Sequence, residues 1–277
     1  MRRRKLIKSA AGLTFGVIMT GLYTYRIEPY WLQFITVDMH ISGLPQHLKG
    51  KILMQISDIH VGNRFDYNFI IRSFEKAKNY QPDIVVYTGD YISYESEEQI
   101  TQLQEVMSHT VTGKLATVGI LGNHDYGINW DQQAVADQVT DTLEEYGVSV
   151  LNNQSIDING LSITGLDDYW GPNFSPLQVL SDLATDGPKV VLCHNPDVCD
   201  LDIWGTYKGW ILSGHTHGGQ CKPPFLKPPM LPVKNKTYSH GHIPLSEDRH
   251  LYINRALGCL WPVRFNMRPE ITVFRLV

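Results

Sequence analysis

Five short runs of polar residues, each just after a short apolar segment, constrain this 277-residue chain more than any other feature. The apolar segments are predicted as buried strands over residues 51–56, 83–87, 115–120, 189–193 and 208–213. The polar residues that follow them are Asp58 and His60, Gly89 and Asp90, Gly122 to Asp125, His194 and Asn195, and Gly214 to His217. Ligands of open α/β sheets bind beyond the carboxyl ends of the strands, so the sequence predicts one shared site at that edge.

Strands alternate with helices along most of the chain. Apolar residues at helical spacing predict helices over 67–80, 97–108 and 131–146, and another is expected to begin at Ser175-Pro176. Further strands are predicted over 34–41, 251–254 and 271–276. Asn159-Gly160 lies between two short apolar runs and indicates an antiparallel hairpin. The combination predicts an α/β fold with mixed sheets.

The polar runs supply carboxylates, imidazoles and one carboxamide, but no thiolate. Such donors suit Mn²⁺, Fe or Zn²⁺. They exceed the four ligands of a tetrahedral zinc, so we expect two divalent metal ions about 3.5–4 Å apart. Residues two apart on an extended segment point the same way, which would bring Asp58 and His60 to one ion, and likewise His215 and His217. Glycines precede ligands at 89, 122 and 214, where positive φ and sharp turns are expected.

The chain resembles the calcineurin-like metallophosphoesterase superfamily in the order and content of its motifs. These motifs are Asp58-x-His60, Gly89-Asp90, Gly122-Asn123-His124-Asp125, His194 and Gly214-His215-x-His217. The N-terminus and residues 255–270 are similar to a bacterial membrane-associated branch that includes phosphodiesterases and UDP-2,3-diacylglucosamine pyrophosphatases. The resemblance implies a four-layer αββα sandwich with two mixed β-sheets.

The resemblance also implies a role for each motif residue. The implied ligands are Asp58, His60 and His217 for a first metal, Asn123, His194 and His215 for a second, and Asp90 as the bridge between them. His124 would be the catalytic general acid or the phosphate-contacting histidine, and Asp125 would orient it. The implied reaction is hydrolysis of a phosphoester by metal-activated hydroxide.

Departures from the superfamily pattern narrow the range of expected substrates. Protein phosphatases of the superfamily carry Asp and Arg soon after the bridging aspartate, whereas Tyr91-Ile92-Ser93 follows Asp90 here. The net charge of −4, without a basic stripe in the body of the chain, argues against nucleic acid. We expect a phosphodiesterase or pyrophosphatase of a small or lipid-linked substrate, with no obligate protein partner. A broad phosphomonoesterase and a non-catalytic, membrane-bound binding module are the alternatives.

Residues 1–30 are predicted as a basic N-terminus with a membrane anchor or twin-arginine-like signal, and residues 35–277 as the catalytic domain. The uncharged run 9–25 would span about 25 Å as a helix, the short end of what crosses a bilayer. The preceding basic residues and Arg3-Arg4 favour membrane association with the domain outside the cytoplasm. The alternative is the cytoplasmic face, with the segment lying in the membrane interface.

Segment 223–232 contains five prolines among apolar residues and is predicted as a loop. One interpretation is a buried connector packed on the domain. The other is an apolar lip beside the metals that contacts lipid, extended by Trp261, Pro262 and Phe265.

Overall fold

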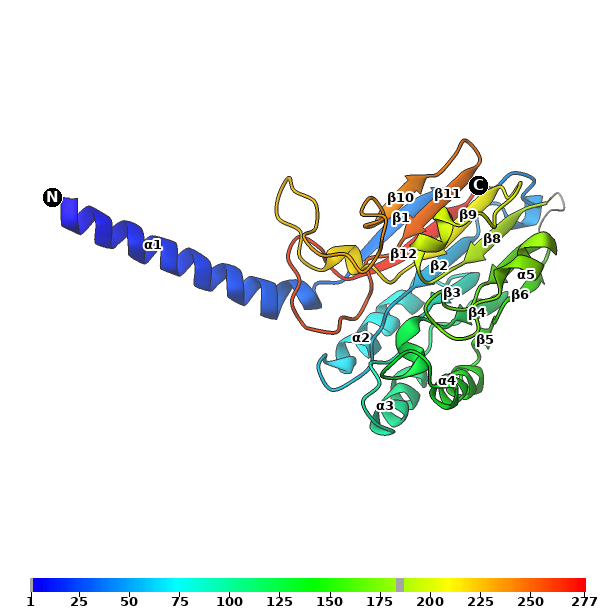
Figure 1. Ribbon diagram of the computed structural model, residues 1–277, viewed down its shortest axis with the longest axis horizontal. Coiled ribbons are helices and arrows are strands. Elements are labelled where there is room, and N and C mark those ends of the chain that lie inside the picture. The colour runs from blue at the N-terminus through cyan, green and yellow to red at the C-terminus, as the bar shows by residue number, and fades with distance from the viewer. Residues whose placement is uncertain (1, 183–186) are drawn as a thin grey trace.

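The computed structural model describes residues 2–182 and 187–277, in which two six-stranded sheets pack face to face (Figure 1). The first sheet has the order β1 (Gln33–Met39), β12 (Glu270–Leu276), β2 (Ile52–Ile56), β3 (Ile84–Thr88), β4 (Ala116–Ile120) and β5 (Ser149–Val150). The second has the order β10 (Gly241–Pro244), β11 (Arg249–Ile253), β9 (Gly209–Ser213), β8 (Lys189–Leu192), β7 (Leu161–Gly165) and β6 (Gln154–Ile158). Each sheet contains parallel and antiparallel pairs, so the predicted α/β class with two mixed sheets is confirmed.

Successive residues of the first sheet face different layers of the core. Leu53 packs between the two sheets, whereas its neighbour Met54 packs under the helices. The covering helices are α2 (Tyr67–Lys78), α3 (Glu98–Met107) and α4 (Gln133–Glu145), which lie along one face of this sheet (Figure 1). Strands buried on both faces explain why these segments are apolar without alternation.

The outer face of the second sheet has a less regular cover. It is packed by α5 (Pro176–Asp182), by the 3-10 turn Pro196–Asp200, and by loop residues such as Trp204 and Tyr207. The layers therefore follow the order expected for an αββα sandwich, but the fourth layer is mostly turns and loops. Residues 193–208, between β8 and β9, form the 3-10 turn Pro196–Asp200 and loops rather than an α-helix.

The predicted elements agree with the structure to within a few residues. Asn159 and Gly160 both have positive φ, of 54° and 91°, as the hairpin between β6 and β7 requires. The edge strand β10 was not predicted, because its four residues include a glycine and a proline.

Helix α1 (Arg2–Leu22) extends away from the body of the molecule (Figure 1). It continues through the π-helical turn Tyr23–Ile27 and the 3-10 turn Glu28–Tyr30. Among the described residues, no helix combines the length and the apolar character needed to cross a membrane. The predicted crossing segment is thus not supported: its uncharged run includes three glycines and four serine or threonine residues, which dilute the apolar ones. The domain boundary predicted between residues 30 and 35 stays a prediction.

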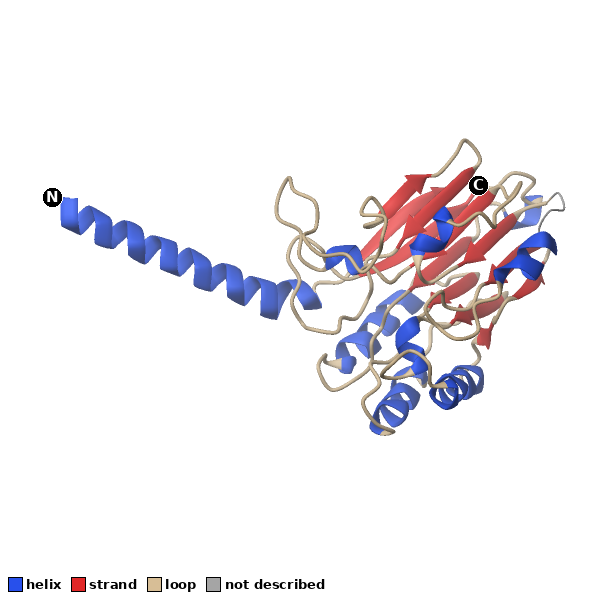
Figure 2. Cartoon of the chain, in the orientation of Figure 1, coloured by secondary structure: helices blue, strands red, loops and turns tan. Residues whose placement is uncertain are grey.

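Strand pairing fixes which end of the molecule carries the polar motifs. Gln55, near the end of β2, pairs with Thr272 near the start of β12, and Glu270 in turn pairs with Gln33 at the start of β1. Strands β3 and β4 run parallel to β2. Their carboxyl ends therefore lie at the end from which α1 leaves, where loops gather (Figure 2).

Candidate metal centre

The residues after the strands form two clusters that share one aspartate. In the first, one ligand atom from each of Asp58, His60, Asp90 and His217 lies within 4.8 Å of all the others. In the second, the same holds for Asp90, His194 and His215. All six residues are buried. The first cluster contains Asp58, His60 and His217 of the predicted first set, the second contains His194 and His215 of the predicted second set, and Asp90 belongs to both. That these residues bind metal stays a prediction.

Imidazoles and carboxylates of the first cluster converge on one point. The Nε2 atoms of His60 and His217 are 2.9 Å apart. His217 Nε2 is 3.2 Å from Asp58 Oδ1, and His60 Nε2 is 3.5 Å from Asp90 Oδ2. Ser93 Oγ lies 3.2 Å from the other ring nitrogen of His60 and can fix its orientation. Nitrogen and oxygen lone pairs aimed at one another at this spacing suit a shared cation.

Backbone carbonyls set the orientation of both histidines in the second cluster. His194 Nδ1 is 2.7 Å from Thr88 O, and His215 Nε2 is 2.9 Å from Pro232 O. Because a carbonyl oxygen only accepts, each of these nitrogens must donate. The opposite nitrogen then has the free lone pair in the neutral ring, and for His194 that atom lies 3.1 Å from Asp90 Oδ2.

Electrostatics favour ionised Asp58 and Asp90 and neutral His60 and His215, because the pKa of each of these groups is lowered. Burial alone would raise the pKa of Asp58, but His217 lowers it to about 2. Burial and the nearby His194 lower the pKa of His215 to about 3, and burial lowers that of His60. Burial would also lower the pKa of His194, but the charges of Asp90 and Asp58 raise it well above the usual value. His194 therefore favours its protonated form, because the carboxylates of Asp90 and Asp58 stabilise a positive charge on its ring.

Unpaired buried atoms supply a test of whether a metal fits. Both amide atoms of Asn123, Nδ1 of His217 and Nε2 of His194 have no hydrogen-bond partner in the described part of the chain. A buried polar atom without a partner costs roughly 1–3 kcal/mol. Asn123 directly follows Gly122, which approaches both Asp90 and His194. Divalent metal ions fit this donor set, and Asn123 fits the second cluster.

The backbone at the ligands is left-handed, which corrects the expected geometry. Asp58, His60, Asp90, His215 and His217 have φ values of 52°, 46°, 57°, 68° and 51°. Neither Asp58-x-His60 nor His215-x-His217 is an extended segment. Asp58 and His60 still reach one cluster, but His215 and His217 lie in different clusters, so the expectation that both reach one ion is wrong. Such a conformation costs an L-residue roughly 1–2 kcal/mol and concentrates at functional sites.

Two of the three glycines serve close approach instead of a positive φ. Only Gly89 has one, at 87°. A Cβ at Gly122 would lie 2.4 Å from Asp90 Oδ1, and one at Gly214 would lie 2.2 Å from Asp58 Oδ2. The ligand carboxylates therefore occupy the space that a side chain at these positions would need.

The carboxylate of Asp125 is hydrogen-bonded to the backbone of the Asp90 loop. Asp125 is fully buried and accepts four backbone N–H groups, from Gly122, Asp90, Tyr91 and Ile92. In the described residues no hydrogen bond joins it to the imidazole of His124. Burial and the Asp90 charge raise the pKa of Asp125, while the N–H donors act against that rise.

His124 lies at the edge of the centre and is only partly buried. Its backbone N–H donates to Asp90 Oδ1 at 2.9 Å, and its ring centroid is 5.1 Å from that of His60. This position leaves the imidazole beside the clusters, where a substrate oxygen can reach it. Its role in catalysis stays a prediction.

Two tryptophans that sequence reasoning missed stand beside the centre. Trp130 and Trp170 stack with ring centroids 5.1 Å apart. Trp130 contacts the ring of His124 at 5.9 Å, and Trp170 contacts that of His215 at 4.5 Å. Both lie in loops, where no regular spacing of residues predicts their position, so their stacking beside the centre is seen only in the folded chain.

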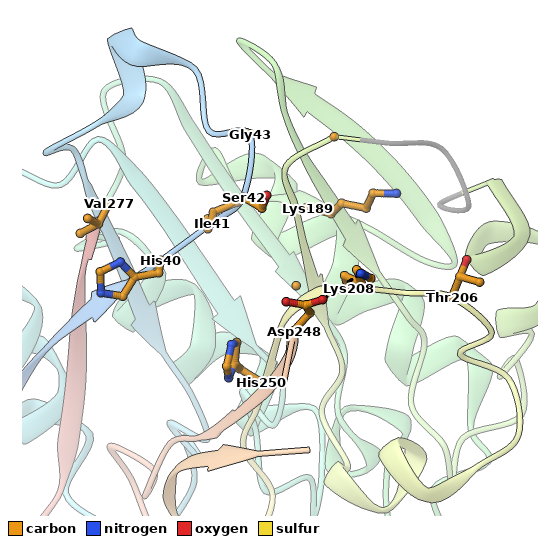
Figure 3. Close-up of a pocket in the computed structure, with 12 residues that line it drawn as sticks. His40, Ile41, Ser42, Gly43, Lys189, Thr206, Lys208, Asp248, His250 and Val277 are labelled. Atoms are coloured by element: carbon orange, nitrogen blue, oxygen red, sulfur yellow. Dashed lines mark ion pairs between the residues drawn. The ribbon is translucent and has the colours of Figure 1, made fainter. Parts of the chain in front are cut away.

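A cavity of about 830 Å³ lies at the opposite edge of the second sheet, where β8, β9 and β11 begin. Figure 3 shows His40, Lys189, Lys208, Asp248 and His250 around it. Asp248 pairs with Lys208 at 2.8 Å. None of the predicted ligands lines this cavity, so we assign the chemistry to the carboxyl ends of the strands.

Comparison with known proteins agrees with this geometry. The calcineurin-like phosphoesterase family matches residues 52–219, which include all nine predicted site residues. The phosphodiesterase YaeI of Escherichia coli is 27% identical over 99% of each chain. YkuE, a metallophosphoesterase of Bacillus subtilis, is 30% identical over 100% of this chain and 98% of its own. The UDP-2,3-diacylglucosamine pyrophosphatase LpxG of Chlamydia muridarum is 24% identical over 96% of each. The similarity to these three proteins runs nearly end to end.

Proposed function

This chain belongs to the calcineurin-like phosphoesterase family and is a metal-dependent hydrolase of phosphoesters, and on that premise we propose that it cleaves a phosphodiester or pyrophosphate with two divalent metal ions. One observation carries the proposal: Asp90 belongs to both clusters of metal-competent atoms. A carboxylate shared in this way is what a two-metal site requires. Oxygen and nitrogen donors suit Mn²⁺, Fe or Zn²⁺.

The proposed ligands follow from the two clusters. They are Asp58, His60 and His217 for one ion, Asn123, His194 and His215 for the other, and Asp90 for both. When bound, two such ions supply Lewis acidity and lower the pKa of a water molecule. The protein holds the donors in place through Asp125, which fixes the backbone of the Asp90 loop. We propose that His124, whose ring centroid lies 5.1 Å from that of His60, gives a proton to the leaving oxygen or contacts the phosphoryl group.

We propose a small or lipid-linked diester or pyrophosphate as the substrate. The names of YaeI and LpxG support this class, because one is a phosphodiesterase and the other a pyrophosphatase of an acylated sugar nucleotide. Tyr91-Ile92-Ser93 after the bridging residue argues against a protein phosphatase.

We also propose that the protein works at a membrane surface, with its domain outside the cytoplasm. The support is the basic N-terminus, its paired arginines and the uncharged run 9–25 that follows, whose apolar side chains are exposed on α1. Protease treatment of intact cells tests the orientation. Digestion of the domain is expected, and its protection would instead place the enzyme on the cytoplasmic face.

The proposed activity is tested with bis-p-nitrophenyl phosphate against p-nitrophenyl phosphate, using the full-length protein stripped by chelator and then given Mn²⁺. Diester cleavage is expected to return with the metal and to be lost in Asp90→Asn and His124→Ala. Asp141→Asn, an exposed position on α4, is the matched control. Preference for the monoester would favour a phosphomonoesterase. Protein that binds no metal would overturn the site assignment, and two bound ions without turnover of either substrate would favour a binding role.

A further inference from the structure

Exposed apolar side chains are concentrated at the metal end of the molecule. From Trp31 onward, six large apolar side chains among those described are at least 60% exposed. Ile128, Phe225, Leu226 and Met230 lie in loops that follow site motifs, and Trp261 lies in the loop between β11 and β12. The sixth, Leu177, lies on α5 at the far side from α1 (Figure 1). We call Phe225, Leu226, Met230 and Trp261 the apolar rim.

The loops that carry the apolar rim are bonded to the ligand loops and to each other. Pro232 O, at the end of the proline-rich loop, lies 2.9 Å from His215 Nε2. Lys222 N donates to Phe265 O at 2.8 Å, which joins this loop to the loop that carries Trp261. Gly258 N in turn donates to Asp58 O at 2.8 Å. The apolar rim therefore has a fixed place beside the metal centre.

The same loops hold the base of α1. Arg264 N donates to Thr24 O at 3.0 Å, and the rings of Tyr23 and Phe265 meet edge to face at 6.5 Å. Beyond this junction α1 exposes Leu13 and Phe15, each about two-thirds exposed. Two segments far apart in the sequence thus lie at one end of the molecule (Figure 1), and both carry exposed apolar side chains.

Charge is segregated in the same way. Residues 1–27 and 221–236 contain ten of the 24 lysines and arginines of the chain and none of its 28 aspartates and glutamates. The remainder is strongly acidic. An anionic lipid surface attracts the first group and repels the second, so it selects one orientation of the molecule. Docking onto a protein surface would not require single apolar side chains on a proline-rich loop, whereas insertion between lipid headgroups does require them.

We propose that the apolar rim docks the metal end of this protein onto an anionic lipid bilayer, so that it takes the phosphoester of a membrane-embedded amphiphile at headgroup depth. The proposed docking onto lipid does not depend on the reaction that the metal centre catalyses. The substrate class rests on the proposed function. Apolar side chains enter the headgroup region, lysines such as Lys227 meet lipid phosphates, and the centre opens at the level of the headgroups.

A fluorescent label on the apolar rim tests the docking. Phe225→Cys in the full-length protein is labelled with the polarity-sensitive dye NBD and mixed with phosphatidylglycerol or phosphatidylcholine vesicles. Its emission is expected to rise about twofold with phosphatidylglycerol and to be quenched by doxyl-labelled lipid. Leu177→Cys, equally exposed but remote, is the matched control and is expected to stay unchanged. The unsubstituted protein corrects for labelling of Cys221.

Two results would overturn the docking proposal. A label at 225 that stays in water while the protein floats with vesicles would mean that α1 alone attaches it. A signal that rises with protein concentration without lipid would mean that the apolar rim contacts a second copy of the chain.

A second variant connects docking to substrate choice. Serine at all four positions of the apolar rim is expected to lower, at least tenfold, the ratio of turnover of a vesicle-borne diester to that of a soluble one, whereas Leu177→Ser keeps the ratio. An unchanged ratio would remove the amphiphile from the proposal. If neither diester is cleaved while the label still enters vesicles, the proposed function fails and the docking surface stands.

Discussion

Replacing Asp125 by asparagine tests whether this carboxylate builds the metal centre through the backbone or acts on His124. Oδ2 of Asp125 accepts the N–H groups of Asp90 and Gly122, each at 2.8 Å. Oδ1 accepts those of Tyr91 and Ile92, at 2.7 and 3.2 Å. All four donors belong to the two loops that present Asp90 and Asn123.

The magnitude follows from how many acceptors asparagine keeps. Its amide has one oxygen, so two of the four N–H groups lose their acceptor and face an NH₂ group. Each buried donor left without a partner costs roughly 1–3 kcal/mol, which predicts a fall of about 2–6 kcal/mol in the free energy of unfolding. The Asp90 loop must move to relieve this arrangement, so binding of both metals is expected to weaken.

Urea unfolding at constant m value measures the stability, and metal analysis of the purified protein measures the occupancy. Asp157→Asn is the matched control, because Asp157 is exposed and accepts a single N–H, from Gly160. Its effect is expected within about 0.5 kcal/mol. The reasoning fails if Asp125→Asn keeps its stability and its metals while losing turnover as His124→Ala does. Asp125 would then act on His124, as the family resemblance implies.

Three further predictions follow from single contacts. In Gly214→Ala the new Cβ would lie 2.2 Å from Asp58 Oδ2, so that carboxylate must shift by about 1 Å. We expect roughly a 100-fold loss in kcat/KM together with depleted metal, and no loss in the control Gly16→Ala, where the space is open. Full metal occupancy in Gly214→Ala would contradict this prediction. Chelation is expected to lower the Tm and added Mn²⁺ to restore it, because the ligands meet only in the folded chain; an insensitive Tm would speak against a metal in the centre. Burial raises the pKa of Asp83, but Ile52 N–H and Lys51 lower it below its usual value overall, so Asp83→Asn should cost about 1 kcal/mol of stability at neutral pH. This cost should shrink as the pH falls through the lowered pKa of Asp83, because the wild-type carboxylate is then protonated too, and urea unfolding at both pH values checks it.

The sequence predicts the fold and the identity of the cluster residues because both depend on local patterns. Segments such as 83–87 are short, apolar and β-branched, and each ends at a group that can bind metal. The shared edge of the sheets then brings those groups together, as the two clusters show. The hairpin at Asn159-Gly160 follows in the same way, because only residues that accept positive φ form its turn.

Other features depend on contacts between distant segments and leave no local signal. The hydrogen bonds of Asp125 depend on where the Asp90 loop lies, whereas the sequence shows only that Asp125 directly follows His124. Trp130 and Trp170 come from separate loops and meet only over the centre. Net charge also conceals the basic end of the molecule, because −4 is a sum over segments of opposite sign. The extended geometry expected for Asp58 and His60 is wrong because backbone bonds to a neighbouring motif hold both residues in the left-handed region.

The left-handed backbone conformation of the predicted ligands shows why these motifs occur as a set. Five residues at roughly 1–2 kcal/mol each amount to a cost comparable to the stability of a whole domain, so strong contacts must hold them. Those contacts come from the other motifs: Asp58 N donates to Gly89 O at 2.9 Å, His60 N to Asp90 O at 3.1 Å, and His215 N to Asp58 Oδ1 at 2.9 Å. Each motif therefore positions the next one as well as offering a ligand. A lone Asp-x-His could not keep this backbone, whereas the full set of motifs can.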